Sequence, residues 1–379
     1  MSGLENIRLK NILHLYSNHK WTGPADHALN LVAWQKRDSR VNPIFACSHR
    51  KGRQNHLWVK ARERQLPCLN DLFLYKHLHW KMVSDVYALK KIVARRHIDV
   101  VHCHQNNDAF TAVLAGFGNR MIRTCYDGHP PAFNFRQRIV FRHAAKILAA
   151  SNHVGNQLQQ RYPHQEIEHI DIPVDLEKFR PMPKCRKLQK EFGIDSRDPV
   201  AGIVARVQKH KNFELLIDAL EMIVKKLPQF KFLIVGRGTH IDTIARQPIQ
   251  KKGLQKRVIF TGYREQDYRE VLNLFDFKVF LYPGSDGACR AVREALACGK
   301  PVIATKKGIL PELVKDGQTG MLIDENPQAL ANVMMMLFQK TQYRMEMARA
   351  ARTYAQRVLN PEAYIEKVLA AYDSITVNE

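Results

Sequence analysis

Short apolar runs alternate along the chain with longer segments in which apolar residues recur every three or four positions. The short runs are typical of buried strands, and the longer segments, such as residues 27–36 and 83–95, are typical of helices. Strands that alternate with helices form parallel sheets with helices on both faces. The strands predicted in the first half are residues 11–16, 43–47, 99–104, 121–126, 146–150 and 166–172. Those predicted in the second half are residues 200–204, 231–235, 258–262, 277–281, 301–304 and 320–323.

Twelve strands are more than one open sheet of this kind usually holds, so the pattern predicts two doubly wound α/β domains in tandem. The seam falls in the polar stretch 173–198, which contains three prolines and is typical of a connection between domains. The predicted parts are residues 1–178, residues 179–360, and a last helix in residues 361–379 that is expected to pack back on the first domain. Open sheets bind ligands at the carboxyl ends of their strands, so the expected site is the cleft between the domains.

Composition excludes several classes of protein. The 379 residues are 45% hydrophobic and 25% charged, as in folded proteins. The longest apolar stretches reach only about half of the roughly 20 residues that cross a bilayer, and the charged first ten residues do not resemble a secretory signal. Seven cysteines are scattered without a C-x-x-C spacing, which favours reduced thiols in the cytoplasm over disulfides or a zinc ribbon.

The positive charge is concentrated in the first half. The net charge of the chain is +23, of which residues 1–165 carry +16. Residues 50–96 interleave twelve Lys and Arg with Trp and Tyr, a mixture that suits the surface of an anionic membrane. The alternative is an ordinary solvated helix face. Nucleic acid would also attract this charge, but no recognised nucleic-acid-binding motif is present, so nucleic acid is not an expected partner.

The second half carries a segment suited to an anionic ligand. Residues 285–301 predict a glycine-containing turn after a strand, then a helix, then a glycine stop. Small residues in the turn let a ligand approach the backbone, and the amides of the first helical turn attract anions. Asp286 precedes the turn and Glu294 follows eight residues later, so the two carboxylates could reach opposite ends of a phosphate-bearing ligand. The turn itself is Asp286-Gly287-Ala288-Cys289.

This segment resembles the signature of retaining GT-B glycosyltransferases of family 4, in which two Glu stand eight residues apart before Ala-x-Ala-x-Gly-x-Pro-Val. The resemblance implies two Rossmann-like domains. It also implies that Asp286 holds sugar hydroxyls, that Glu294 holds the ribose of the nucleotide, and that the amides around Ala288 and Cys289 face the diphosphate. Asp286 stands where Glu is usual, and its shorter arm could alter the choice of donor.

Other segments of the second half extend the resemblance. Residues 205–212 are similar to the family's Arg-x-x-x-x-Lys-Asn loop, which implies that Arg206 and Lys211 bind the diphosphate. Such cations neutralise the charge that develops on the leaving phosphate. Residues 315–320 also match. Further donor-binding positions implied by the matching motifs are Gly236, Gly262 and Tyr263.

The first half resembles the family more loosely. Gly23, in residues 22–31, resembles a single-glycine form of the family's glycine-rich loop, which approaches the donor phosphate and the acceptor. After residues 121–126 many members carry a His, and Tyr126 stands in its place. Asp127 and His129 are nearby candidates to contact the sugar or take the proton of the acceptor; the alternative for His129 is to cap a proline turn. The resemblance also implies that the departing phosphate can take this proton.

His102 and His104 lie on one face of a predicted strand and could form half of a metal site. No further ligand follows at a suitable spacing, and the resemblance implies catalysis without a metal. Hydrogen bonding at the strand end is therefore the expected role, and no metal is expected.

Taken together, these features predict a retaining, metal-independent glycosyltransferase of the hexosyltransferase type with no cofactor beyond its nucleotide-diphosphate sugar donor. The expected acceptor is a cell-envelope glycolipid or polysaccharide precursor, as in lipopolysaccharide biosynthesis. The expected location is the cytoplasm or the inner face of the cytoplasmic membrane. One alternative is a phosphorylase or sugar synthase of the same fold with a soluble acceptor. Another is a non-catalytic module that binds membrane or nucleic acid.

Overall fold

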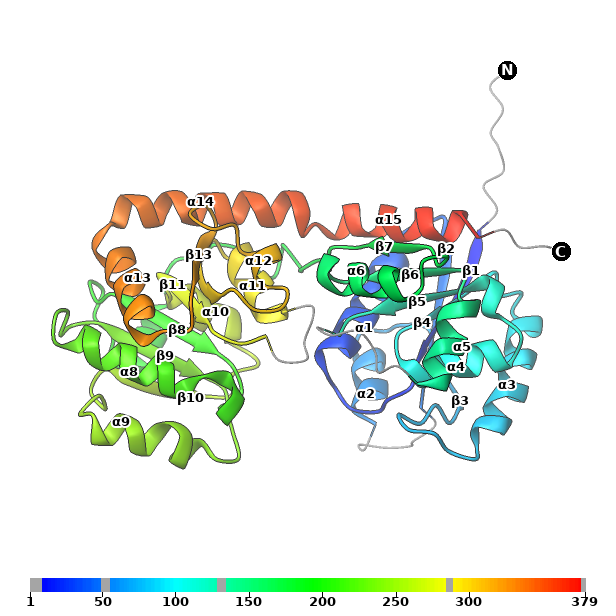
Figure 1. Cartoon of the computed structure of the whole chain (residues 1–379), viewed down its shortest axis with the longest axis horizontal. Helices are drawn as coiled ribbons and strands as arrows, with labels where there is room; N and C mark the ends of the chain where they lie inside the picture. The colour runs from blue at the N-terminus through cyan, green and yellow to red at the C-terminus, as the bar shows by residue number, and fades with distance from the viewer. Residues whose placement is uncertain (1–8, 49–54, 128–133, 284–288, 376–379) are drawn as a thin grey trace, which may run out of the picture. The chain divides into compact units, whose positions relative to one another are not determined.

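A computed structural model describes residues 9–48, 55–127, 134–283 and 289–375. The chain forms two compact α/β units (Figure 1). The first unit takes in residues up to Ile172 together with the C-terminal residues from Glu362 onward, and the second runs from Pro173 to Pro361. Within the described residues, no helix combines the length and apolar character that a bilayer crossing requires.

The first unit is built on a parallel sheet. Its described residues form seven strands in the order β3-β2-β1-β4-β5-β6-β7. The strands are β1 (Lys10–Tyr16), β2 (Val41–Ser48), β3 (Cys68–Leu72), β4 (Val100–Cys103), β5 (Met121–Cys125), β6 (Lys146–Ala149) and β7 (Ile167–His169). The helices are α1 (Gly23–Gln35), α2 (His56–Glu63), α3 (Met82–Arg95), α4 (Asn106–Leu114), α5 (Phe135–His143) and α6 (Asn152–Arg161).

The two faces of this sheet are covered by different helices. Leu13 and Leu15 of β1 belong to a buried cluster with residues of α3, α4 and α5. Ile12 faces the other way, into a cluster that includes residues of α1 and of α15 (Pro361–Asp373). Because alternate residues of a strand point to opposite faces, His14 lies on the face covered by α1 and α15. The C-terminal helix is therefore part of the first unit's core.

The second unit repeats the plan. Its described residues form six parallel strands in the order β10-β9-β8-β11-β12-β13. The strands are β8 (Val200–Val204), β9 (Lys231–Val235), β10 (Val258–Gly262), β11 (Phe277–Phe280), β12 (Val302–Thr305) and β13 (Gly320–Ile323). The helices are α7 (Arg186–Glu191), α8 (Phe213–Val224), α9 (Gln247–Lys251), α10 (Tyr268–Leu274), α11 (Arg290–Ala297), α12 (Leu310–Leu313), α13 (Pro327–Gln339) and α14 (Thr341–Val358).

All the predicted strands are present. The structure differs from the prediction in the length of one strand, in one additional strand and in the boundary between the units. The strand predicted over residues 166–172 is shortened to Ile167–His169, and β3 at the sheet edge was not predicted. The units divide after Ile172, six residues before the predicted boundary at 178. The reason is that Val174 and Phe179 are buried in the second unit's core, where the Val174 amide also bonds the Leu359 carbonyl at 3.1 Å.

Candidate functional site

Three loops meet at the carboxyl ends of β8, β9 and β10 in the second unit. The Ala205 amide donates to the Val235 carbonyl at 3.1 Å, and the Gly236 amide donates to the Gly262 carbonyl at 2.9 Å. These bonds place the loop that carries Arg206 beside two of the predicted glycines. The structure therefore brings together residues that the sequence separates by more than fifty positions.

Glycine is required at the centre of this arrangement. Gly236 has φ of +145°, and a Cβ built on it would lie 2.1 Å from the carbonyl oxygen of Ala205. A Cβ on Gly238 would lie 2.2 Å from the carbonyl oxygen of Val207. Such distances are far below van der Waals contact, so any side chain would force the loops apart.

The two predicted cations differ in how they are held. Lys211 ends a short 3₁₀ turn, and its ammonium donates to the Tyr282 carbonyl at 3.0 Å. The same ammonium lies 5.7 Å from the ring centroid of Tyr282 and 6.0 Å from that of Phe280. Arg206, on the loop after β8, is exposed. Lys211 is thus fixed at the carboxyl end of β11, while Arg206 is open to solvent.

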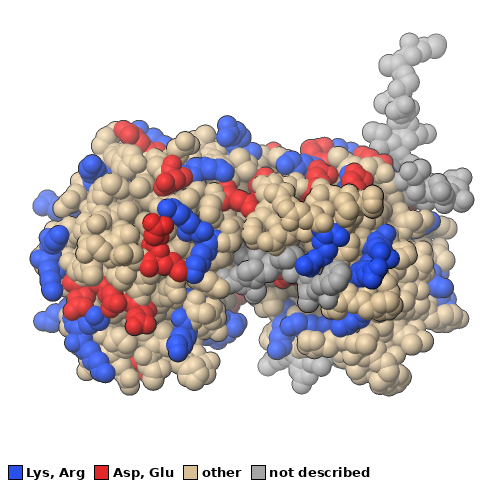
Figure 2. All heavy atoms as spheres, viewed as in Figure 1, with Lys and Arg blue, Asp and Glu red and all other residues tan. Residues whose placement is uncertain are grey.

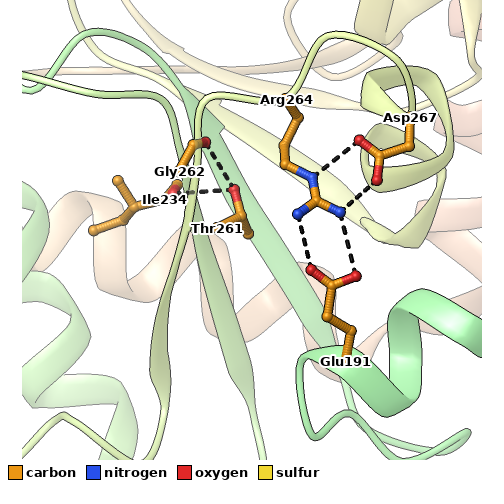
Figure 3. A network of polar contacts seen from close by, with 6 residues as sticks. All are labelled: Glu191, Ile234, Thr261, Gly262, Arg264 and Asp267. Atoms are coloured by element: carbon orange, nitrogen blue, oxygen red, sulfur yellow. Dashed lines mark hydrogen bonds and ion pairs between the residues drawn. The ribbon is translucent and has the colours of Figure 1, made fainter.

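The loop after β10 is fixed by an ion-pair network. Gly262 has φ of +74°, and Tyr263 after it is exposed with the Arg237 guanidinium 5.0 Å from its ring centroid. Arg264 then binds two carboxylates, from Glu191 of α7 and Asp267 before α10 (Figure 3). This clamp holds the loop directly after Tyr263.

Glu294 is a buried carboxylate, and each of its two oxygens has a side-chain partner. It lies on α11, and one oxygen accepts a hydrogen bond from the Tyr268 hydroxyl at 2.7 Å. The other oxygen lies 3.4 Å from Nε of Arg290. Burial, followed by the charge of Glu294, raises the pKa of Tyr268 well above its ordinary value, so this hydroxyl stays a donor. Sequence reasoning missed Tyr268, because a pairing over 26 residues leaves no local pattern.

Lys278 is a second residue that the sequence did not single out. It lies on β11 beneath α11, and its ammonium donates to the Ala291 carbonyl. Burial lowers its pKa to about 7, against the opposing charge of Glu294. Lys278 therefore ties the first turn of α11 to the strand before it. Cys289, which precedes α11, is buried with φ of +42°; Asp286, Gly287 and Ala288 lie outside the described residues.

The site residues predicted in the first half follow strands of the first unit. Gly23 begins α1, where the Thr22 hydroxyl accepts from the Ala25 amide at 3.4 Å. Asp127 follows β5 and is exposed. Tyr126 is buried, and its hydroxyl lies 3.0 Å from Nδ1 of His104. His129 lies outside the described residues.

Three buried histidines form a cluster, of which the sequence indicated two. His14 of β1 joins His102 and His104, with ligand atoms within 4.8 Å of one another, so the three could hold a metal ion. The sequence prediction considered only ligands that follow His104, and His14 precedes it. The rings of His102 and His104 are stacked at 4.4 Å, and those of His14 and His104 at 5.3 Å. Every ring nitrogen of the three has a hydrogen-bond partner. With each ring nitrogen so engaged, the three rings form a polar hydrogen-bond network in this structure.

The network has a consistent set of neutral tautomers. The Gln35 side-chain oxygen accepts from Nε2 of His14 at 2.7 Å, which leaves Nδ1 of His14 to accept from His104 at 3.0 Å. The Gln35 amide donates to the Tyr372 hydroxyl at 2.9 Å, and this hydroxyl lies 2.7 Å from Nδ1 of His102. Burial lowers the pKa of His14 to about 4. The network thus joins α1, β1 and β4 to the C-terminal helix with uncharged imidazoles.

Comparison with solved structures defines the class of protein. The structure of Anabaena Alr3699/HepE in complex with UDP aligns with a TM-score of 0.81 at 21% identity, covering 96% of this chain and 100% of that chain. A glycosyltransferase from Rickettsia africae aligns with a TM-score of 0.84 at 20% identity, covering 98% and 100%. Two Rossmann-like units with parallel sheets, similar to these glycosyltransferases, define the GT-B fold, and the predicted fold class is confirmed.

Family models match both halves of the chain. Residues 21–178 match the family described as Glycosyltransferase Family 4, and residues 185–354 match the family described as Glycosyl transferases group 1. These matches take in most of the chain, which belongs to the group 1 glycosyltransferases of GT-B fold. The resemblance predicted from the motifs is therefore confirmed.

Relatives show which chemistry similar chains perform. A GDP-mannose-dependent alpha-(1-6)-phosphatidylinositol monomannoside mannosyltransferase of Mycolicibacterium smegmatis is 32% identical over 43% of this chain and 44% of that protein. The lipopolysaccharide core biosynthesis mannosyltransferase LpsB of Rhizobium meliloti is 28% identical over 41% and 47%. N-acetyl-alpha-D-glucosaminyl L-malate synthase of Bacillus anthracis is 24% identical over 76% of each chain. The match spans less than half the length of either mannosyltransferase.

Proposed function

We propose that this glycosyltransferase moves a hexosyl group from a nucleotide-diphosphate sugar to a cell-envelope glycolipid or polysaccharide precursor, with retention at the anomeric carbon and without a metal. The observation that carries the proposal is the convergence in the second unit of the loops after β8, β9 and β10, at the carboxyl edge where open α/β sheets bind ligands. The names of relatives that use GDP-mannose and of a neighbour solved with UDP-glucose support the donor class.

In the donor site, Arg206 and Lys211 neutralise the diphosphate, and Glu294 binds the ribose. The close approach at Gly236 and Gly238 keeps the loops after β8 and β9 in backbone contact at the edge where the diphosphate would bind, with Gly262 beside them. Tyr263, exposed beside Arg237, offers a ring edge to the nucleotide. Breaking the sugar–phosphate bond moves negative charge to the leaving oxygen, and cations fixed in advance stabilise that charge most. The turn Asp286-Gly287-Ala288-Cys289 completes this site, with Asp286 on the sugar hydroxyls.

The first unit supplies Gly23 to the donor site, and Asp127 and His129 on the acceptor side. In a retaining reaction the attacking hydroxyl and the departing phosphate lie on the same face of the sugar. We propose that the phosphate oxygen takes the acceptor's proton, and that Asp127 or His129 orients the acceptor. Relatives named for a phosphatidylinositol mannoside and for a lipopolysaccharide core support an envelope acceptor. Such acceptors require a peripheral association with the inner face of the cytoplasmic membrane.

Substitution of one donor-site residue at a time tests this function. Lys211→Ala and Glu294→Ala should each abolish transfer and donor hydrolysis while the fold, checked by circular dichroism, stays intact. A screen of UDP-, GDP-, ADP- and TDP-sugars by thermal shift identifies the donor, and calorimetry with the stabilising sugar should show weaker binding for both variants. Lys251→Ala, an exposed lysine on α9, serves as control.

Two results would contradict the assignment. Full turnover by both variants would exclude these residues from the reaction, and the lack of binding to any nucleotide-diphosphate sugar would leave a non-catalytic module. Transfer to a soluble sugar or phosphate, with none to a lipid-linked acceptor, would instead identify the phosphorylase or synthase alternative.

A further inference from the structure

Exposed apolar side chains gather at one place on the first unit. Four of the eleven large hydrophobic side chains exposed by the described residues lie within ten consecutive positions, and the other seven are scattered over both units. The four are Leu78 at 58% exposure, Trp80 at 76%, Val83 at 77% and Tyr87 at 64%. Single exposed apolar residues are ordinary, whereas a contiguous group marks an interaction surface.

Three of these residues follow one side of a helix. The Val83 amide donates to the Trp80 carbonyl at 3.2 Å, so Trp80 lies one turn before Val83, and Tyr87 lies one turn beyond it. Spacings of three and four residues align side chains on a helix. The opposite side of α3 is buried, through Leu89 and Val93. The stripe therefore faces away from the core of the unit.

Lysines surround the stripe, and the acidic residue of the same segment is turned inward. Residues 72–98 contain six Lys and Arg and a single acidic residue, Asp85. Asp85 is buried, and its carboxylate accepts the backbone amides of Phe73 at 2.6 Å and Leu74 at 2.9 Å. The Lys91 ammonium lies 4.4 Å from the ring centroid of Tyr87. We call the following set the α3 surface: Leu78, Trp80, Val83 and Tyr87 with Lys76, Lys81, Lys90 and Lys91.

The distribution of charge over the first unit also indicates an interaction surface. On the face drawn in Figure 2, the acidic side chains of this unit gather along the C-terminal helix, and Lys and Arg predominate below that helix. On this face, the excess of positive charge in residues 1–165 lies apart from the acidic side chains of the C-terminal helix. Such a unit is attracted to an anionic surface before any specific contact forms.

We propose that the α3 surface docks on an anionic lipid bilayer. Trp and Tyr side chains are favoured at the membrane–water boundary, Leu and Val enter the acyl region, and lysines reach the anionic headgroups while their stems cover apolar surface. Single-stranded nucleic acid also attracts lysines and aromatic rings. Leu78 and Val83 offer no ring on which a base could stack, so the surface favours the bilayer.

A pocket adjoins the α3 surface at the strand ends. The rings of Tyr75 and His79 lie 4.3 Å apart, and those of His79 and Trp80 lie 5.7 Å apart, so aromatic rings lead from the surface to this pocket. Ser17, after β1, and Asn107, in α4, are among the residues that line it. The Ser17 hydroxyl is buried and has no hydrogen-bond partner among the described residues. This pocket has room for little more than a water molecule. The docking proposal rests on the proposed function in one respect: it would bring a membrane acceptor to this side of the first unit.

Tryptophan fluorescence tests the docking directly. All four tryptophans lie in described residues, and Trp80 is the exposed one among them. The full chain, without donor, is titrated with vesicles of equal parts phosphatidylglycerol and phosphatidylcholine. We expect binding with a blue shift of the emission, and added salt should weaken the binding. Trp80→Phe should still sediment with the vesicles but lose the shift. Equal binding to pure phosphatidylcholine vesicles would overturn the proposal.

Two double variants separate the apolar and cationic contributions. Trp80→Ser with Tyr87→Ser, and Lys90→Glu with Lys91→Glu, should each reduce vesicle partitioning by roughly tenfold or more. Phe135→Ser, at an exposed aromatic residue of α5, and Lys251→Glu, at an exposed lysine of the second unit, are matched controls. Parent-like vesicle binding by both double variants would overturn the proposal, as would binding to single-stranded oligonucleotides but not to vesicles.

The same assay distinguishes docking from catalysis. Lys211→Ala should bind the anionic vesicles as the parent chain does, because Lys211 lies in the second unit. If no nucleotide sugar binds and vesicle binding persists, the proposed function fails and the docking surface stands. If transfer occurs and vesicle binding is absent, the docking surface fails and the proposed function stands.

Discussion

Glu294 shows how a single carboxylate is prepared for a ligand by partners elsewhere in the chain. A carboxylate buried without hydrogen bonds would be protonated or strongly destabilising. Here the Tyr268 hydroxyl and the Arg290 guanidinium satisfy its two oxygens. A side chain held in one orientation loses less conformational entropy when it binds. In our proposal, Tyr268 is a positioning residue for the ribose contact.

Removal of the Tyr268 hydroxyl should therefore weaken donor binding in addition to costing the folded state this hydrogen bond. A hydrogen bond to a charged group is worth about 1.5–3 kcal/mol, so Tyr268→Phe should raise the donor dissociation constant roughly tenfold, as measured by calorimetry. Tyr343→Phe is the control, since that exposed hydroxyl bonds the Gly317 carbonyl at 3.3 Å in the same unit. Unchanged donor affinity in Tyr268→Phe would show that the hydroxyl does not orient Glu294 for binding.

At the scale of elements, the donor site depends on loops that touch through their backbones. The loop after β9 passes so close to the loop after β8 that glycine is needed at Gly236 and Gly238. The clamp of Arg264 on Glu191 and Asp267 holds the loop after β10 from its other side (Figure 3). Three strand ends are thereby fixed before a ligand arrives.

Gly236→Ala tests whether this close approach matters for binding. The new Cβ would lie 2.1 Å from the Ala205 carbonyl oxygen, so the loops must separate. Gly253→Ala is the control: its φ of +68° is also unfavourable for alanine, but no atom lies within 4 Å of the new Cβ. We expect Gly253→Ala to lose about 1–2 kcal/mol of unfolding free energy with normal donor affinity. Gly236→Ala should lose more stability and most of its donor binding, and equal affinities in the two variants would contradict the proposed site.

The sequence predicted elements well where local pattern decides them. β8 and β9 are almost wholly buried, and their apolar runs gave their bounds correctly. β3 was missed because it is an edge strand whose residues Cys68 to Leu72 include Asn and Asp and bury only Leu72. The roles of Tyr268 and His14 were missed for a different reason. Each depends on a partner that only the three-dimensional fold brings near.

At the scale of the whole molecule, the C-terminal helix completes the first unit through the buried histidine network. Tyr372 of α15 bonds Gln35 of α1 and lies 2.7 Å from a nitrogen of His102. Near the surface, Lys10 donates to the Tyr372 carbonyl at 3.2 Å, and Arg40 pairs with Glu366. The C-terminal helix α15 thus contributes to the stability of the first unit, although it follows the second unit in sequence.

This network makes the first unit sensitive to acid. Burial lowers the pKa of His14 to about 4, and it lowers the pKa values of His102 and His104 well below the ordinary value. The unfolded chain therefore binds more protons than the folded chain as the pH falls below 6.5, and stability is lost toward pH 4. Asp108 acts in the opposite direction, because burial raises its pKa to about 7. Between pH 7.5 and 5, the titration of His14 alone lowers the free energy of unfolding by about 2 kcal/mol, and that of Asp108 raises it by about as much. His102 and His104 therefore decide whether the first unit loses stability on acidification.

Denaturant unfolding followed by tryptophan fluorescence measures this effect selectively, because all four tryptophans belong to the first unit and the second unit has none. The fluorescence midpoint should fall from pH 7.5 to pH 5. His104→Asn removes one titrating ring, so this variant should be less stable at pH 7.5 but lose less stability on acidification. His153→Asn, at an exposed histidine of α6, is the control and should follow the parent. If His104→Asn and the parent lost the same stability between the two pH values, the charge-neutral network would not be the source of the acid sensitivity. A smaller loss would assign it to the buried histidine network to which His104 belongs.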